Sequence, residues 1–108
     1  MTTLRINRAS LPRGGAVKIQ HKGEAILLAD VDGTVCAISS VCPHMGTDLA
    51  EGTIADGVVT CRGHGARFEL RTGRNVGPAK ILFVKMKVRD VRAYPVTISG
   101  DEVEIGLD

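Results

Sequence analysis

The sequence predicts a single all-β domain, and three observations carry that prediction. Thirteen of the 108 residues are glycine, which favours many tight turns over long helices. No window of about a dozen residues keeps the 3.6-residue period of an amphipathic helix. Short apolar or alternating runs recur instead between turn signals, a pattern typical of an antiparallel β sandwich or barrel.

The expected elements follow the chain in order. Two short strands joined by Asp32-Gly33 predict a hairpin, and Asp56-Gly57 precedes a β-branched run. The C-terminal segment "YPVTISGDEVEIGL" predicts another hairpin, which turns about Gly100-Asp101. Before this last hairpin, strands are expected at Ala16–Gln20, Ala25–Ala29, Thr34–Ser39, Val58–Thr60 and residues 66–70.

Composition excludes several classes of protein. The formal net charge is only +2 and there is no set of aromatic side chains for stacking, so we expect no nucleic-acid binding. The N-terminal segment "MTTLRINRASLP" lacks the apolar stretch of a secretory signal, and the longest apolar runs are too short to cross a membrane. Three cysteines without an export signal indicate a reducing cytoplasm and metal binding rather than disulfides.

Two matched Cys/His pairs are the strongest chemical signal. Cys42 and His44 form a C-x-H pair, and Cys61 and His64 form a C-x-x-H pair sixteen residues later. The intervening segment is long enough to run out and back as a hairpin, which would bring the two pairs face to face. Four such ligands suit either a structural zinc ion or a two-iron cluster in which two cysteines hold one iron and two histidines the other. The alternation of ligand types favours the cluster, because zinc sites usually group their cysteines together.

The segments "CPHMG" and "CRGHGARFELRTG" resemble the two cluster-binding motifs of Rieske proteins. Similarity to the small Rieske-type ferredoxins extends over residues 10–78 and 93–106. The resemblance implies one Rieske domain over residues 1–108, with an antiparallel β base and a cluster-binding subdomain at about residues 40–79. It also implies one [2Fe-2S] cluster per chain, with Cys42 and Cys61 on one iron and His44 and His64 on the other.

Residues around the ligands add to the resemblance. High-potential Rieske proteins carry an extra cysteine in each loop, joined as a disulfide, and a Ser and a Tyr that hydrogen-bond the cluster. Thr47, Gly63, Ala66 and Phe68 stand at those four positions here. A cluster with two neutral imidazoles is formally uncharged when oxidised, which favours reduction, but missing hydroxyl donors lower the potential again. We therefore predict the low end of the Rieske range, on the order of −150 mV.

A low-potential Rieske ferredoxin carries electrons and is not itself an enzyme. The resemblance implies that an NAD(P)H-dependent flavoprotein reductase reduces the chain, which then reduces a terminal oxygenase of aromatic hydrocarbon catabolism. Alternatives within the group are a small Rieske subunit of a nitrite-reductase-like enzyme and a carrier of a respiratory or archaeal system. An alternative of another class is a zinc-stabilised interaction module.

Two further features concern the surroundings of the ligands. Gly46, Gly63 and Gly65 suit tight turns and, compatibly with that role, would let backbone N–H groups approach the cluster. Pro78 either belongs to a loop that resembles the one shielding the cluster in this family or is a plain turn proline. Residues 80–92 hold five basic residues and one acid and are longer than in the ferredoxins. The alternation of apolar and basic residues over 84–89 predicts a strand with a basic face. That face is either a solvated edge or a docking patch for an acidic partner.

Overall fold

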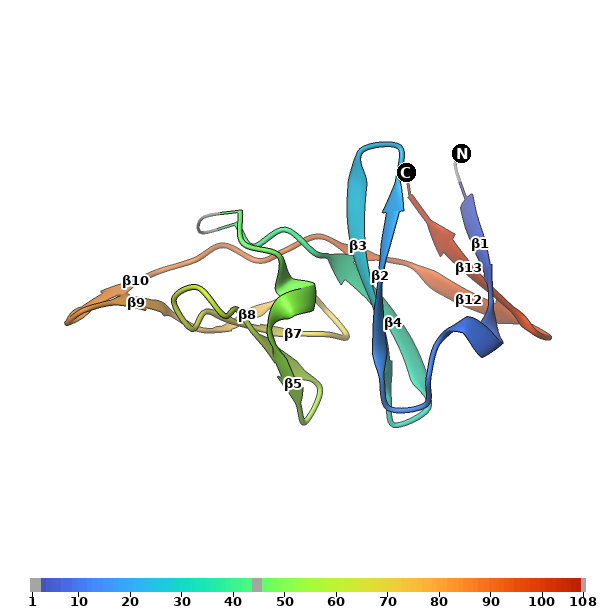
Figure 1. Cartoon of the computed structure of the whole chain (residues 1–108), viewed down its shortest axis with the longest axis horizontal. Helices are drawn as coiled ribbons and strands as arrows, with labels where there is room; N and C mark the ends of the chain where they lie inside the picture. Colours follow the sequence, from blue (N-terminus) through green and yellow to red (C-terminus); the bar gives the residue numbers. More distant parts are fainter. Residues whose placement is uncertain (1–2, 44–45, 108) are drawn as a thin grey trace.

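The computed structural model describes residues 3–43 and 46–107, and the fold is all-β as predicted (Figure 1). Every pair of neighbouring strands is antiparallel. In the described ranges the only helical segments are two single 3-10 turns, at Arg8–Ser10 (η1) and Leu49–Glu51 (η2). No helix in that part of the chain is long and apolar enough to cross a membrane.

Within the described residues, the strands form three sheets and a separate hairpin. The first sheet has the order β1-β13-β12, from Thr3–Asn7, Glu102–Gly106 and Val96–Ser99. The second has the order β11-β4-β3-β2, from Ala93–Tyr94, Thr34–Ser39, Glu24–Val31 and Ala16–His21. The third has the order β5-β6-β7-β8, from Thr53–Ala55, Val58–Thr60, Arg67–Glu69 and Asn75–Gly77. The hairpin pairs β9, Ala79–Ile81, with β10, Val84–Met86.

The predicted hairpins are present. Asp32 and Gly33 have φ values of 52° and 88°, and Asp56 and Gly57 have 54° and 74°. Positive φ at both central residues is the geometry of the tight turns that match the twist of antiparallel strands. The strand β1 was not predicted, although the alternating Leu4 and Ile6 carry the signal: both are half-buried and pair with residues of β13.

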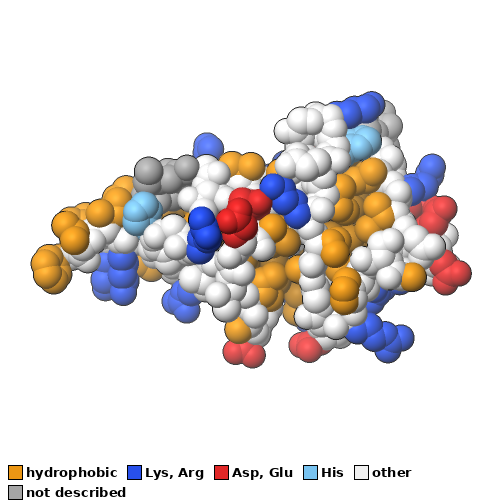
Figure 2. Space-filling model, viewed as in Figure 1, with side chains coloured by type: hydrophobic (Ala, Val, Ile, Leu, Met, Phe, Trp, Pro, Cys, Tyr) orange, Lys and Arg blue, Asp and Glu red, His pale blue; other side chains and the backbone are white. Residues whose placement is uncertain are grey.

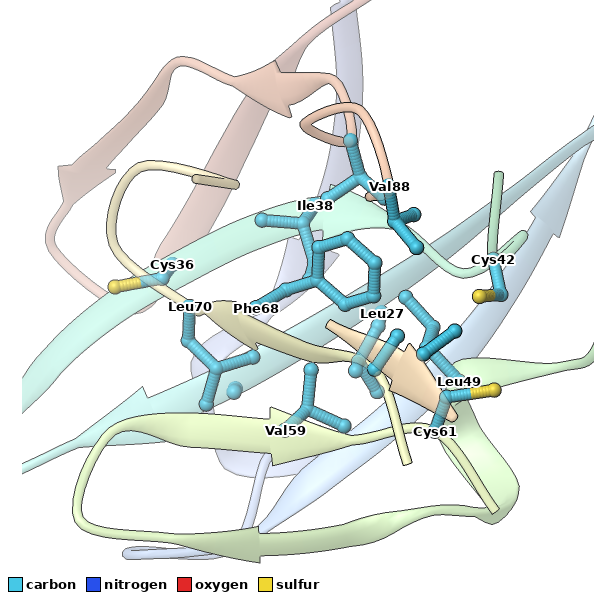
Figure 3. Close-up of a cluster of buried hydrophobic side chains, with 14 residues drawn as sticks. Leu27, Cys36, Ile38, Cys42, Leu49, Val59, Cys61, Phe68, Leu70 and Val88 are labelled. Carbon is cyan, nitrogen blue, oxygen red and sulfur yellow. The ribbon is translucent and has the colours of Figure 1, made fainter. Parts of the chain in front are cut away.

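The second sheet is buried on both of its faces, and this divides the core in two. On β3, Leu27 and Ala29 belong to one apolar cluster, while Ile26 and Leu28 belong to the other. The first cluster also contains Val59 and Phe68 of the third sheet (Figure 3), and the second contains Val103 and Ile105 of the first sheet. A strand covered on both faces needs a continuous apolar run, which explains the sequence "AILLA".

The strand predicted over residues 84–89 is too long. It ends at Met86, and residues 87–92 run without strand pairing to β11. Val88 and Val91, three residues apart, are both buried in the first cluster, which a strand alternating by two could not achieve. The backbone is held near Gly73: the Val91 N–H donates to the Gly73 carbonyl at 2.9 Å.

Candidate functional site

Two loops hold the predicted ligands and are called the first and second ligand loops. The first follows β4 and closes on itself. The Cys42 N–H donates to the Thr47 carbonyl at 2.9 Å, and the Gly46 N–H donates to the Cys42 carbonyl at 2.8 Å. Gly46 has a φ of 73°, a left-handed conformation that most other residues adopt only with strain. His44, the second predicted ligand of this loop, lies outside the described residues.

The second ligand loop, between β6 and β7, has the same hydrogen-bond pattern. The Cys61 N–H donates to the Ala66 carbonyl at 2.8 Å, and the Gly65 N–H donates to the Cys61 carbonyl at 3.1 Å. Gly65 also has a positive φ, 80°. In each loop the cysteine carbonyl therefore accepts from a left-handed glycine four residues later, and the cysteine N–H donates five residues ahead. The hydrogen bonds made by the cysteine backbone are thus the same in both loops.

The two loops lie against each other. A β-carbon placed on Gly63 would be 3.1 Å from Thr47 Oγ1, 3.8 Å from Thr47 Cβ and 3.6 Å from Cys61 Sγ. Cys42 is 1% exposed and Cys61 is 3% exposed, and both belong to the first apolar cluster. Figure 3 shows them on two different loops at the same edge of that cluster. The sequence prediction that the loops meet is thus matched by the structure.

His64 lies between the first apolar cluster and the surface. The residue as a whole is half-buried, but its Nδ1 atom is shielded from solvent. Its carbonyl accepts the Lys80 N–H at 2.8 Å, which fixes the second ligand loop against β9. One imidazole nitrogen therefore faces inward, and the residue keeps part of its surface in water.

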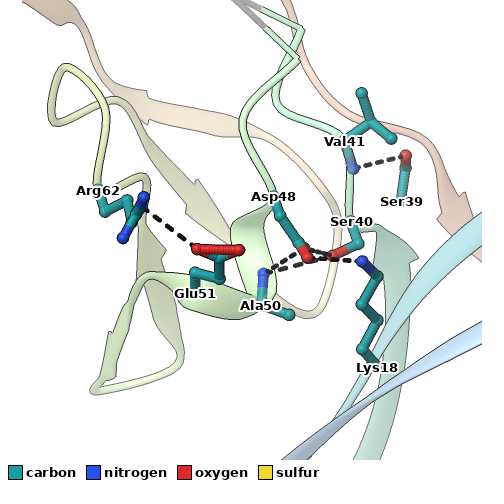
Figure 4. Close-up of polar contacts among 8 residues, drawn as sticks. All are labelled: Lys18, Ser39, Ser40, Val41, Asp48, Ala50, Glu51 and Arg62. Atoms are coloured by element: carbon teal, nitrogen blue, oxygen red, sulfur yellow. Dashed lines mark hydrogen bonds and ion pairs between the residues drawn. The ribbon is translucent and has the colours of Figure 1, made fainter.

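The base of the first loop is held by a network centred on Asp48 (Figure 4). Its carboxylate accepts from Ser40 Oγ at 2.5 Å, from Lys18 Nζ at 2.6 Å and from the Ala50 N–H at 3.0 Å. Burial raises the pKa of Asp48, but these hydrogen bonds and the Lys18 charge outweigh it, and the pKa lies below its usual value. The network joins β2 to both ends of the loop, since Asp48 also bridges to Val41.

Sequence reasoning did not identify this network. The available signal was the order of Asp48, a short turn and Glu51, which is typical of a capped helical start. Asp48 is indeed the N-cap of η2. Gly52, which ends η2, was also missed: a β-carbon there would lie 2.1 Å from the Thr60 carbonyl oxygen. Gly52 therefore lets the segment after the first loop lie against Thr60, the last residue of β6, and β6 leads into the second loop.

The surrounding residues predicted to matter have different environments. Gly46 and Gly65 face open space where a β-carbon would stand, so their conformation, and not contact, requires glycine. Gly63 faces Thr47 and the Cys61 sulfur. Pro78 lies between β8 and β9 and is exposed.

The donor set fits the predicted cluster. Two buried thiols on matching loops and one inward imidazole nitrogen are soft ligands screened from water. Over residues 3–43 and 46–107, no three His, Cys, Asp or Glu side chains converge as around a single metal ion. A cluster with two protein ligands on each iron does not require such convergence.

The fold and the paired loops define the class of small all-β iron–sulfur domains. The sequence-family model of the Rieske [2Fe-2S] domain matches residues 3–95, and the chain belongs to this family. It is 33% identical to the ferredoxin component of biphenyl 2,3-dioxygenase from Rhodococcus jostii (strain RHA1), over 91% of this chain and 85% of the relative. It is 31% identical to the biphenyl dioxygenase ferredoxin subunit of Pseudomonas sp. (strain KKS102), over 86% and 80% respectively.

A solved structure agrees with these sequence relatives. The ferredoxin of carbazole 1,9a-dioxygenase from Nocardioides aromaticivorans IC177 is similar with a TM-score of 0.84 and 26% sequence identity, and 100% of both chains is covered. The similarity therefore extends over the base sheets as well as the ligand loops.

Proposed function

We propose that this chain is a one-electron carrier that holds a Rieske [2Fe-2S] cluster and passes electrons to the terminal oxygenase of an aromatic-degrading system. The relatives described above are ferredoxin components of dioxygenases, and the Rieske model spans most of the chain. The electrons would come from an NAD(P)H-dependent flavoprotein reductase. In this scheme the chain is an accessory protein and the oxygenase performs the catalysis.

The observation that carries this proposal is the pair of matching ligand loops. Cys42 and Cys61 would hold one iron, and His64 together with His44 would hold the other. Bound there, the cluster would accept and release one electron at a time. The chain's own contribution is to keep both thiols buried, to set the loop backbones by the two left-handed glycines and to leave His64 partly exposed at the surface.

The environment of the loops supports a low potential. Ala66 and Phe68, which stand where hydroxyl donors are found in high-potential members, are 1% and 0% exposed. Both side chains are apolar, so neither can stabilise the extra negative charge of the reduced state by a hydrogen bond. We expect a midpoint potential on the order of −150 mV. We also place the carrier in the cytoplasm, where thiols stay reduced.

The proposal is tested on the purified chain and then in a reconstituted system. We expect a red-brown protein whose visible absorption bleaches on reduction, with a midpoint well below zero by redox titration. The chain should be reduced by the reductase of its own system and should then reduce the oxygenase. A colourless protein that contains zinc, or a carrier that reduces no oxygenase, would refute the proposal.

A further inference from the structure

The β9–β10 hairpin exposes a set of apolar side chains at one end of the molecule. Leu82 is 91% exposed and Phe83 is 103% exposed, and Val84 beside them is 60% exposed. Figure 1 shows the hairpin extending outward past the third sheet, and Figure 2 shows apolar side chains at its end. We call Ile81, Leu82, Phe83 and Val84 the hairpin tip. A tip of this kind costs solubility, so its presence calls for an explanation beyond folding.

The residues of this turn are unusual by the chain's own standard. Three other tight turns with positive φ place a polar residue before glycine, at Lys22-Gly23, Asp32-Gly33 and Asp56-Gly57. At the hairpin tip Leu82 takes a φ of 55°, a conformation that glycine or asparagine adopts at lower cost. Neither Leu82 nor Phe83 gains burial in return. Apolar side chains are therefore present where turn formation alone would favour polar ones.

The hairpin is attached directly to the second ligand loop. The Lys80 N–H of β9 donates to the His64 carbonyl at 2.8 Å, and Pro78 alone separates β8 from β9. Figure 2 shows the hairpin's apolar and basic side chains beside a histidine on the same face. A surface that covers the tip and follows the hairpin inward would therefore also cover the His64 side of the site.

Basic side chains accompany the tip and limit what can bind there. Lys80, Lys85, Lys87 and Arg89 are all exposed, and none forms an ion pair within the part of the chain that the structure describes. A second copy of this chain would bring the same positive charges together, which disfavours pairing of two tips. An acidic partner surface would be attracted by all four positive charges.

We propose that the hairpin tip is the docking element for the terminal oxygenase, inserting Leu82 and Phe83 into an apolar recess bordered by carboxylates. This inference rests on the proposed function, because only a redox partner must approach His64 closely. The tip supplies affinity through burial of apolar surface, and the basic residues accelerate encounter. The oxygenase, and not the reductase, is assigned because one solved structure of this fold is a complex of a ferredoxin with its oxygenase.

The main test replaces the tip without disturbing the turn. In the variant L82G/F83N, glycine takes the positive φ of Leu82 at the first central position and a polar residue follows it, so the hairpin should be retained. The Kd for the oxygenase of the reconstituted system, measured by calorimetry, should rise at least about tenfold at every ionic strength. The visible spectrum and the midpoint potential should match those of the wild-type chain, and the thermal midpoint should be no lower. Ile98 on β12 is 48% exposed, and I98T serves as the matched control with unchanged affinity.

A second variant separates charge from apolar contact. K85E/K87E should slow association about tenfold at low salt, and the difference from the wild-type chain should shrink as salt is added. If L82G/F83N does not retain its thermal midpoint, F83S provides the same test with one change in the turn. Its expected loss of affinity is in the same direction and smaller.

Several results would overturn the assignment. One is a folded tip variant whose affinity for the oxygenase is unchanged. Another is a tip variant that loses binding to the reductase but keeps binding to the oxygenase. A third is binding of the wild-type chain to vesicles of phosphatidylcholine and phosphatidylglycerol that the tip variant loses while its oxygenase affinity stays the same. Failure of the proposed function looks different, because the wild-type chain would then reduce no oxygenase and the assignment would fall with it.

Discussion

A disulfide introduced between the ligand loops tests their juxtaposition directly. In the double variant T47C/G63C, the two β-carbons would be 3.8 Å apart, the mean separation found in disulfides. Gly63 is not in the left-handed region, so its backbone accepts a side chain. The tight 3.1 Å contact is with Thr47 Oγ1, which the substitution removes. We therefore expect the two new thiols to oxidise to a bridge without movement of the backbone.

The size of the effect follows from the loop that the bridge closes. Fifteen residues separate Thr47 from Gly63, and closing a loop of that length restricts the unfolded chain by about 3 kcal/mol. For a domain of this size, that stabilisation corresponds to a rise of about 10–20 °C in the thermal midpoint. The gain belongs to the oxidised double variant only.

The assay combines alkylation with unfolding. After mild oxidation, intact mass after thiol alkylation in denaturant should show that the double variant has lost two reactive thiols. Its thermal midpoint should exceed that of the same protein treated with dithiothreitol, while the single variants T47C and G63C should show no such difference. Complete alkylation of both new cysteines, or an oxidised protein no more stable than the reduced one, would show that the loops do not face each other as described.

Three further predictions concern the surroundings of the loops. A66S places a hydroxyl beside Cys61 and should raise the midpoint potential by about 60 mV, the equivalent of about 1.4 kcal/mol, in a redox titration; a fall would contradict the argument. G52A forces a β-carbon against the Thr60 carbonyl and should lower the free energy of unfolding in urea by about 3 kcal/mol, whereas G14A, whose β-carbon meets nothing, should show only its backbone strain. Because its folded pKa is depressed, Asp48 stabilises the protein above about pH 4 and loses that effect on further acidification. Unfolding of D48N should therefore depend less on pH below 4; an unchanged profile would exclude Asp48 as the cause.

Much of the fold was predictable because β hairpins are encoded locally. Asp32-Gly33 and Asp56-Gly57 adopt the turn conformations that their residue types favour, and the flanking strands follow from alternation. The N-terminal strand was less accessible, because its partner β13 lies at the other end of the chain. Which side of each strand meets which core also depends on packing between sheets, which no local pattern contains.

The site shows the same division. The spacing of Cys42 and Cys61 with their histidines is a local signal, and it predicted two loops that meet. Asp48 was missed because its role depends on Ser40 and Lys18, which are distant in sequence or carry no signal of their own. The basic alternation around Lys85 was interpreted as a longer strand, but the buried positions of Val88 and Val91 required the chain to leave that period.

The sheet β11-β4-β3-β2 has a consequence for cooperativity. One face of this sheet packs against the third sheet, near the ligand loops, and the other face packs against the first sheet, which contains the terminal strands. Local opening of one half would expose part of the surface on which the other half rests. Slow amide hydrogen exchange in β3 should therefore change when the ligand loops are altered. Exchange in the terminal strands β1 and β13 should change as well, although these strands do not contact the site.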